Sequence, residues 1–267
     1  MQDSSVTKRF ANWILVRPVL IRGIAFLLIL LISLYVLYQY YEGQRGRFYK
    51  GAHEVSEITK RDVQQSLDQC FSAALTASFA IGPQGQVSEF DSIASSIIQL
   101  NRRINAVELM PEGIIRYIYP DTENHPIRGY NIFKDSIRNK KAIRAKETGR
   151  MYFGGPFELR EGGQAIVGFR PVYRQNKFWG FTAVLIRLDV LLNMAGIGKE
   201  DSHGYFSQLS RVNSKTRKEK FFSPFTGEGS GEAIISTTVP ETDWIISVYS
   251  RTTFGFFNRF WGWLVFI

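Results

Sequence analysis

Hydrophobic and polar residues alternate in long blocks along this chain of 267 residues. An uncharged run over 23–41, GIAFLLILLISLYVLYQYY, would rise about 28 Å as an α-helix, close to the roughly 30 Å of a bilayer's hydrocarbon core. A long mixed segment follows, and a second, aromatic-rich apolar run occupies 254–267. The pattern predicts a transmembrane helix over the first run, the opening of another over the last, and a folded domain between them.

The tail before the first apolar run indicates its orientation. Residues 1–22 carry four basic side chains against one acid, and short basic flanks stay in the cytoplasm. We therefore expect a cytoplasmic N-terminus and place residues 42–253 outside the inner (plasma) membrane, in the periplasm. A cleavable signal peptide is the alternative. It fits less well, because the apolar run exceeds the roughly 7 to 15 residues of a signal's core and no small-x-small site follows.

A helical period continues beyond the first run. Apolar residues recur at steps of three to five residues opposite a charged face: Ala52, Val55, Ile58, Val63, Leu67, Cys70, Phe71, Ala74 and Leu75. This predicts an amphipathic stalk helix over 42–82, continuous with the membrane helix and ended by Gly82-Pro83-Gln84-Gly85. Two roles remain open for its lower half, pairing in a parallel homodimer or packing on its own domain.

The segment 83–192 predicts one helix and then mostly strands. The helix has a single apolar stripe made of Phe90, Ile93, Ile97, Leu100 and Ile104. Next come a strand at 114–119 and a helix that Asp135 or Ser136 caps and that stops at Gly149. Three strands at 151–159, 165–174 and 178–187 and a short helix at 188–194 complete the segment. A helix and three meandering strands fit a small sensor sheet of the PAS type.

The segment 193–253 predicts a second, smaller sheet. Its strands are expected near 204–212, 220–222, 234–239 and 244–249. The expected fold class is therefore α+β, with a long N-terminal membrane and stalk helix followed by two tandem PAS-like antiparallel-sheet units.

Composition and charge narrow the function classes. Hydrophobic residues make up 45% of the chain and charged residues 21%, as in globular domains. The net charge of +9 is compatible with nucleic acid as a partner. An outward-facing domain meets none, and part of the excess lies in the tail and at 213–220, so we expect the lipid bilayer as partner and no nucleic acid. Lone Cys70 excludes an intramolecular disulfide, and its apolar pattern favours a buried thiol over a link between subunits.

Residue patterns for catalysis or metal binding do not appear in the sequence. The histidines His53, His125 and His203 are scattered, with no pair at metal-ligand spacing. Nucleophile-elbow and phosphate-loop patterns are also missing. We expect no enzyme within these residues, no metal and no cofactor.

Several short motifs occur in a defined order in the middle of the chain. They are PEGIIRYIYP at 111–120, GYN at 129–131, AKETG at 145–149, GPFEL at 155–159, RPVYR at 170–174 and WGFTAVLIRLDVLL at 179–192. In this order and spacing they resemble the CHASE domain, the extracytoplasmic sensor of bacterial and plant membrane receptors. The resemblance covers about 55–192 and extends more loosely through the strand around Trp244. It implies ligand bound in the membrane-distal of two PAS-like units, and a histidine kinase, diguanylate cyclase or phosphodiesterase beyond the second membrane helix.

The resemblance also implies a ligand contact at Asn131. In cytokinin-binding members an aspartate sixteen residues before the glutamate of the ETG motif holds a purine ring, and counting back from Glu147 reaches Asn131. An ionised aspartate only accepts hydrogen bonds, whereas asparagine offers both an acceptor and donors. The amide therefore disfavours a cytokinin and favours a ligand, purine-like or not, that presents a donor and an acceptor. A turn cap after Gly129 is the alternative role.

Further wall residues follow from the same alignment. Phe153 falls where the family's strand backbone meets the ligand. Five side chains on neighbouring strands line the pocket if their alternation points them inward: Met110, Tyr117, Tyr119, Phe169 and Arg170. Plain core packing is the alternative for most of them. Burying Arg170 is costly without an anionic partner, so we expect it to pair with an anionic ligand or, as we favour, with an internal acid such as Glu108.

The predicted function is that of the sensor region of a transmembrane receptor for a small molecule. Ligand binding in the distal unit shifts the stalk and the second membrane helix relative to their dimer partners. Because only the opening of that second helix is present, we expect the sequence to be the N-terminal part of a longer protein. A membrane-anchored structural or adaptor subunit of an envelope complex is the alternative. A closed, partly apolar pocket near Asn131 would favour the receptor, and a filled core with an exposed apolar groove would favour the adaptor.

Overall fold

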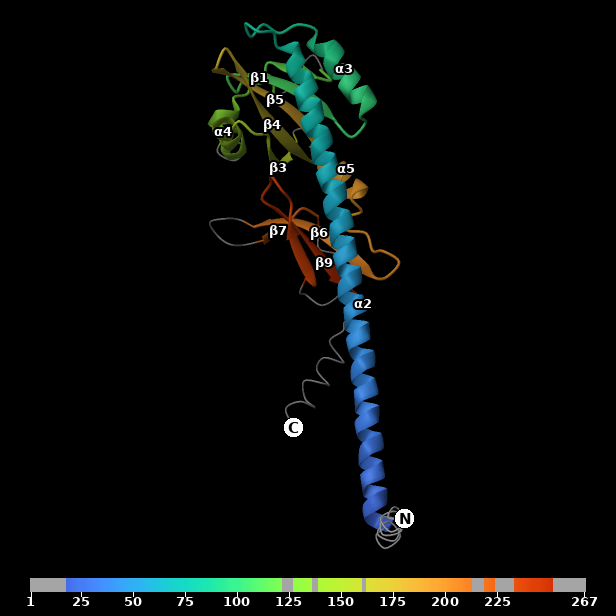
Figure 1. The fold of residues 1–267 in the computed structure, drawn as a ribbon. Coiled ribbons are helices and arrows are strands. Elements are labelled where there is room, and N and C mark those ends of the chain that lie inside the picture. The colour runs from blue at the N-terminus through green and yellow to red at the C-terminus, as the bar shows by residue number, and fades with distance from the viewer. Residues whose placement is uncertain are drawn as a thin grey trace, which may run out of the picture. The chain divides into compact units, whose positions relative to one another are not determined.

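The computed structural model describes residues 18–121, 127–135, 139–159, 162–212, 219–223 and 233–251. The chain divides into two units, residues 1–51 and 52–267. Most of the predicted cytoplasmic tail, up to residue 17, and all of the predicted second membrane run at 254–267 lie outside the described residues. Figure 1 shows the elements and their labels.

One long helix, α2 (Pro18–Ala77), contains the first apolar run and most of the predicted stalk. Within the described residues it is the one helix long and apolar enough to cross a membrane. The side chains of its apolar window, with a mean hydropathy of 2.0, are not buried by the rest of the chain. A single 3₁₀ turn, η1 (Ser78–Ala80), follows α2. The predicted stalk over 42–82 is therefore helical almost to its end.

The next helix, α3 (Phe90–Leu100), is shorter than the predicted apolar stripe. Phe90 and Ile97 are buried as expected, but Leu100 is 90% exposed, so its place in the stripe is wrong. The backbone N–H of Asn101 closes the helix by donating to the Ile97 carbonyl. Beyond this end the 3.6-residue period no longer applies, and Ile104 reaches the core from a loop.

Five antiparallel strands form the first sheet, in the order β2-β1-β5-β4-β3. Their bounds are β1 (Ala106–Pro111), β2 (Tyr117–Tyr119), β3 (Tyr152–Glu158), β4 (Gln164–Arg174) and β5 (Lys177–Arg187). The predictions for β3, β4 and β5 are confirmed to within one residue. β1 has no counterpart among the predicted elements, and the strand predicted at 114–119 is confined to its last three residues.

Three short helical elements connect these strands to one another and to the rest of the chain. They are η2 (Ile132–Lys134), α4 (Asn139–Thr148) and α5 (Leu188–Met194). The predicted helix before Gly149 is confirmed as α4, although its proposed cap Ser136 lies outside the described residues. The helix predicted at 188–194 matches α5.

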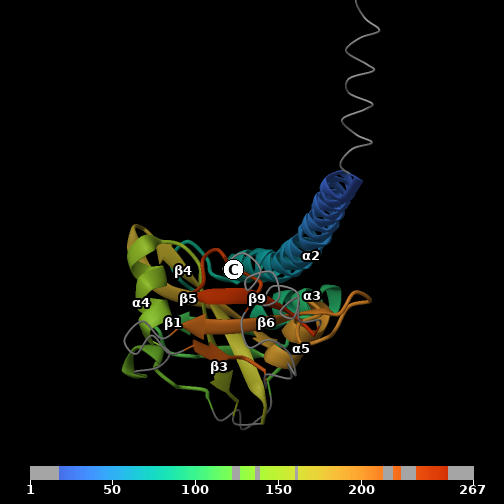
Figure 2. The same cartoon turned by 90° about the horizontal axis from the view of Figure 1, so that it is seen from below.

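Each face of the first sheet packs against different helices. One face, with Leu109, Val184 and Ile186, packs on α2 and α3. The opposite face, with Phe169 and Phe181, packs on α4 and the segment before it. Figures 1 and 2 show α3 and α4 on opposite sides of this sheet. We call these the stalk face and the α4 face.

Four antiparallel strands form the second sheet, in the order β7-β6-β9-β8. Their bounds are β6 (Tyr205–Val212), β7 (Glu219–Phe221), β8 (Ile235–Thr238) and β9 (Trp244–Ser250), which confirms all four predictions. Leu209, Trp244 and Ile246 belong to the same apolar cluster as the stalk residues. The Thr59 hydroxyl of α2 donates to the Ser207 hydroxyl at 3.3 Å. A long helix followed by two antiparallel sheets confirms the α+β fold class.

The single cysteine lies in the packed part of α2. Cys70 is 1% exposed and carries a free thiol. Burial raises the pKa of this thiol from 9.0 to about 12. The predicted buried thiol is therefore confirmed.

Candidate functional site

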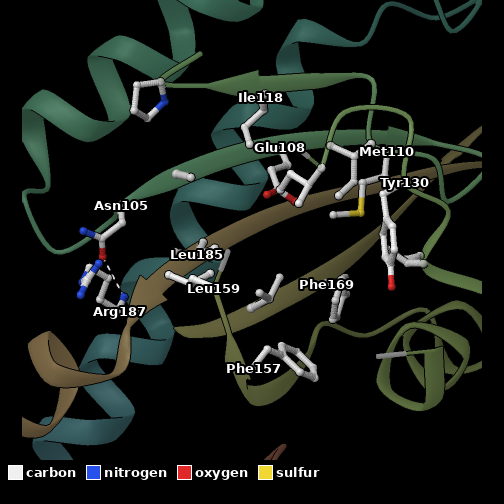
Figure 3. Close-up of a pocket in the computed structure, with 16 residues that line it drawn as sticks. Asn105, Glu108, Met110, Ile118, Tyr130, Phe157, Leu159, Phe169, Leu185 and Arg187 are labelled. Atoms are coloured by element: carbon white, nitrogen blue, oxygen red, sulfur yellow. Dashed lines mark hydrogen bonds between the residues drawn. The ribbon is translucent and has the colours of Figure 1, made fainter. Parts of the chain in front are cut away.

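A cavity of about 420 Å³ opens on the α4 face of the first sheet. Its floor consists of side chains from the strands, and its walls come from the segments on either side (Figure 3). The lining residues are Asn105, Ala106, Glu108, Met110, Ile115, Ile118, Pro120, Ile127, Tyr130, Ile132, Phe157, Leu159, Val167, Phe169, Leu185 and Arg187. Most of these side chains are aliphatic or aromatic, as in sites that bind small organic molecules.

Strand alternation explains which residues face the cavity. In β1 every second side chain, Ala106, Glu108 and Met110, lies on the α4 face. In register, Glu108 of β1 and Phe169 of β4 both flank Ala183 of the central strand β5. A methyl group between two long side chains leaves free volume above the middle of the sheet, which accounts for a cavity at this point.

The segment between β1 and η2 folds over one side of the cavity. Its backbone is held by hydrogen bonds from Ile115 N to Tyr130 O at 3.0 Å and from Ile132 N to Gly113 O at 2.9 Å. Gly113 has a φ of +80°, and a Cβ there would meet the ring of Phe133 at 2.4 Å. Only glycine suits this position, so the local sequence PEG turns the chain back over the sheet.

Polar groups are few in the cavity and unevenly placed. Glu108 is 3% exposed, and Figure 3 shows its carboxyl group directed into the cavity from β1. The Tyr130 hydroxyl donates to a carboxylate oxygen of Asp135. At the other end, the Asn105 side-chain oxygen accepts from the backbone N–H of Arg187 at 2.8 Å. The Arg187 guanidinium is partly exposed and donates from Nε to Asp189 at 3.4 Å.

Of the seven predicted ligand-binding residues, two line this cavity, Met110 and Phe169. Asn131 does not. Its side-chain oxygen accepts from the backbone N–H of Phe133 at 2.9 Å and so caps η2, the alternative role foreseen for it. Its neighbours Tyr130 and Ile132 line the cavity instead, because the backbone there alternates their side chains with that of Asn131.

Tyr117, Tyr119 and Phe153 lie away from the cavity. On β2 it is Ile118 that faces the cavity, and the two tyrosines flank it on the opposite face. Phe153 belongs to the stalk-face cluster. The pairing of β3 with β4 shifts register between Gly154 and Phe157. Such a bulge changes the alternation of side chains, so Phe157 lines the cavity although it lies four residues after Phe153.

Arg170 also projects to the stalk face, and the favoured pairing with Glu108 is wrong. Arg170 lies beside Thr182 in register, whereas Glu108 lies beside Ala183, so the two side chains leave opposite faces of the sheet. The guanidinium instead lies 6.0 Å from the ring centre of Phe71 on α2. Burial first, and then the positive charge of Arg174, lower the pKa of Arg170.

Strands that line the cavity also reach the end of the stalk. The Arg174 guanidinium, at the end of β4, donates to the carbonyls of Ser78 at 3.1 Å, Ile81 at 2.8 Å and Gly82 at 3.1 Å. The Trp179 indole of β5 donates to the Gly85 carbonyl at 2.9 Å. A cation at the carbonyl end of a helix is favourable. The sheet is therefore tied to the last turn of the stalk and to the loop after it.

Sequence patterns alone missed most of the cavity wall. The run 106–110 is apolar apart from Glu108, as in a strand that is buried on both faces. Recognising this run would have added β1 to the predicted strands, but its pattern does not show which face Glu108 takes. In the described part of the chain, no group of three or more His, Cys, Asp or Glu side chains is placed to hold a metal ion.

Solved structures with a similar fold are sensor domains of receptors. An extracellular ligand-binding receptor from Desulfohalobium retbaense aligns with a TM-score of 0.53 and 14% identity over 73% of this chain, but only 39% of that receptor is covered. The ligand-binding domain of the Pseudomonas aeruginosa amino acid chemoreceptor PctC, in complex with GABA, aligns with a TM-score of 0.53 and 16% identity over 73% of this chain and 95% of that domain. The ligand-binding domain of the Campylobacter jejuni chemoreceptor Tlp3, in complex with L-valine, aligns with a TM-score of 0.53 and 13% identity over 79% of this chain and 95% of that domain.

At these identities the likeness shows a shared fold. A search of curated proteins found no match. The sequence model of the CHASE domain matches residues 52–222, more than half of the chain, and this range contains most of the stalk, the first sheet and the cavity. The chain therefore belongs to the CHASE domain family, whose members are extracytoplasmic sensors of signalling receptors.

Proposed function

We propose that this chain senses a small molecule, which binds in the cavity on the α4 face, and relays binding through α2 to an output module in the cytoplasm. The observation that carries the proposal is the cavity itself, about 420 Å³ and mainly apolar, in the sheet of a CHASE domain. In this arrangement the tail at 1–22 is cytoplasmic, the domain is periplasmic, and a kinase or cyclic-di-nucleotide enzyme follows a second membrane helix. The proposal includes domain boundaries at residues 83, 193 and 254, which separate the stalk, the distal unit, the proximal unit and the second membrane run.

The cavity favours a receptor over an adaptor. Tyr130 and Ile132, on either side of Asn131, line it, so a partly apolar pocket close to Asn131 supports the receptor. PctC and Tlp3 are described with GABA and L-valine bound, so amino acids are the first compounds to test. Purines come second. The resemblance to cytokinin receptors suggests them, but Asn131, at the position that holds the purine in those members, does not line this cavity.

The contacts of β4 and β5 support a relay to the stalk. A ligand that moves Phe169 or Leu185 displaces strands whose ends hold the carbonyls of Ser78 and Gly85. A signal requires that the ligand bind two arrangements of the receptor with different affinities, because a ligand with equal affinity for both leaves their populations unchanged.

Ligand binding is tested with the full chain in detergent micelles. Amino acids and purines are screened for a rise in the thermal unfolding temperature, which a ligand of the folded state produces. We expect at least one compound to raise it. Leu185→Phe, which fills the cavity, should abolish the rise, whereas the same change at exposed Leu100 should preserve it. A rise that survives Leu185→Phe would contradict a site in this cavity.

The relay is tested by disulfide trapping between chains in membrane vesicles. Single cysteines replace Val55 or Ile58, positions on α2 that are not fully buried, in a Cys70→Ala background. The ligand found above should change the crosslinking yield, and so should one alanine inserted after Gln44, which rotates the following helix by about 100°. Arg174→Ala should leave binding intact and remove the ligand's effect on the yield. Yields indifferent to both ligand and rotation would contradict the relay.

A further inference from the structure

One end of the cavity, formed by Asn105 and Arg187, carries hydrogen-bond donors that lack acceptors in the described part of the chain. Figure 3 shows these two side chains at one end and Tyr130 at the other. The Asn105 side chain accepts from the backbone N–H of Arg187 at 2.8 Å. Because that partner is a donor, the atom facing it must be the amide oxygen, which leaves the Nδ2 group as a free donor. We call this pair of side chains the donor end.

The guanidinium of the donor end is positioned by two neighbours. It lies against Gly163, where a Cβ would meet Arg187 Nη2 at 2.7 Å, so the glycine leaves the room that the guanidinium occupies. Nε donates to an oxygen of Asp189 at 3.4 Å, and the same oxygen accepts from the backbone N–H of Val190 at 3.0 Å. Among the described residues, the N–H groups of Nη1 and Nη2 have no acceptor.

The ion pair with Asp189 does not satisfy the guanidinium. The side chain of Arg187 is 39% exposed and that of Asp189 is 62% exposed, and ion pairs this open to water are weak. Asp189 takes only the Nε side. The outer edge, made of Nη1 and Nη2, has the two parallel N–H groups that bind a planar carboxylate.

The one acid among the lining residues lies further inside the cavity. Glu108 flanks Ala183, which precedes Arg187 by four residues along β5, a distance of about 13 Å in an extended strand. Glu108 already has an interaction partner within the chain. The donor end is therefore separate from this carboxyl group. Between the two, Leu185 projects from β5 on the same face and offers an apolar surface.

We propose that the cavity takes a small ligand in which a carboxylate is attached to an apolar body, and that Arg187 and Asn105 bind this carboxylate at the donor end. This inference rests on the proposed ligand-binding function of the cavity. A carboxylate only accepts hydrogen bonds, and both side chains offer donors. The apolar body extends inward over Leu185 toward the aliphatic and aromatic walls.

Three probes of similar size and different charge test this proposal on the full chain in detergent micelles. They are phenylacetate, an anion, phenylacetamide, which is neutral, and phenethylamine, a cation. Their affinities are read from the rise in unfolding temperature with concentration. We expect the anion to bind the wild-type chain most tightly and the cation most weakly. This ranking needs no variant.

Arg187→Met removes the guanidinium and keeps an unbranched apolar side chain. The variant should bind phenylacetate about 10-fold to 100-fold more weakly, the range for lost hydrogen bonds between charged groups. Phenylacetamide should lose only about 3-fold, because a neutral acceptor forms weaker hydrogen bonds. Arg116→Met is the matched control, because it makes the same charge change at an exposed arginine that does not line the cavity. It should leave all three affinities unchanged.

Asn105→Asp tests the second donor with almost no change in shape. The aspartate can still accept from the backbone N–H of Arg187, but a charged oxygen replaces the Nδ2 donor. Phenylacetate should therefore bind at least about 10-fold more weakly. Phenethylamine should bind at least as tightly as it binds the wild-type chain. Unchanged phenylacetate binding would contradict a carboxylate at Asn105.

The outcomes separate failure of this inference from failure of the proposed function. Phenethylamine binding as tightly as phenylacetate, or phenylacetate binding equally to wild type and Arg187→Met, overturns the ligand class. If only an amino acid or purine binds, and Leu185→Phe blocks it while Arg187→Met does not, the cavity is a sensor site and the ligand class is wrong. An amino acid that both variants weaken supports a carboxylate at Arg187. If nothing binds in either experiment, both proposals fail.

Discussion

The two sheets share one stalk but use their faces differently. In the first sheet both faces are covered by apolar clusters, and the α4 face encloses a cavity with one buried acid. In the second sheet the face that joins the stalk cluster is filled by Trp244, and the opposite face carries polar side chains such as Gln208 and Ser210. The contrast indicates that space for a cavity remains where an apolar face is covered but not filled.

A comparison of two tryptophans, one from each sheet, should give the largest difference. Trp244 is 1% exposed and packs edge-on against Phe222, so Trp244→Ala should lower the free energy of unfolding by about 3–5 kcal/mol. Trp179 is partly exposed, and Trp179→Ala should cost about 1–3 kcal/mol, including its hydrogen bond to Gly85. Urea unfolding of the full chain in micelles, followed by circular dichroism, measures both. Equal losses would contradict the difference in packing.

Two identical substitutions compare a filled core with a hollow one. Leu209 of the second sheet is fully buried in the stalk cluster, so Leu209→Phe should cost about 1–3 kcal/mol by overpacking. Leu185 of the first sheet is buried but faces the cavity, so Leu185→Phe extends into free space and should cost less than about 1 kcal/mol, below the range for overpacking. The same unfolding measurement applies. A loss at Leu185 as large as that at Leu209 would mean that the cavity has no room for a larger side chain.

The polar contact between the stalk and the second sheet should have a smaller effect. Thr59→Val keeps the shape of a buried side chain and removes its hydrogen bond to Ser207, at a cost of about 1 kcal/mol. Thr76→Val is the matched control, since Thr76 is exposed and bonds only within the helix, to Ser72. If both variants unfold alike, the Thr59 contact adds nothing to stability.

Cys70 should show no reactivity while the stalk is packed on the first sheet. Its thiol has a pKa of about 12 instead of 9.0, and the thiolate is the reactive form. A thiol reagent should therefore label the chain at pH 8 only after urea is added. The folded state keeps a proton that the unfolded state releases above about pH 9. The contribution of Cys70 to the free energy of unfolding is therefore complete below pH 9 and is lost as the pH rises toward 12. Labelling of the native chain would indicate that the stalk separates from the sheet.

Local patterns predict most of the helices and strands. They fail to predict the burial of a side chain where burial depends on a neighbour in space. The predicted strands at 151–159, 165–174 and 178–187 match β3, β4 and β5 because each carries a strand-like run bounded by glycine or polar residues. Spacing alone predicts Leu100 in the buried stripe, yet Leu100 is exposed. Burial depends on what lies opposite the helix, and spacing does not contain that information.

The candidate site shows the same division. Met110 and Phe169 were identified by alignment, and both face the cavity. The resemblance places both Phe169 and its immediate neighbour Arg170 in the pocket. Successive side chains of one strand point to opposite faces, so only one of the two can face the cavity. The sequence suggests Glu108 only as a partner for Arg170, because no strand is predicted over β1.

By itself the sequence determined the apolar run long enough to cross a membrane, the period of the stalk, most strands of the two sheets and the likeness to CHASE domains. These depend on spacing between near neighbours, which the chain carries directly. Only the tertiary structure decided which face each side chain takes and where space remains. The bulge between Gly154 and Phe157 and the small side chain of Ala183 between Glu108 and Phe169 act through pairing of strands far apart in the chain. That pairing sets the strand register, and the register in turn sets the position of the cavity.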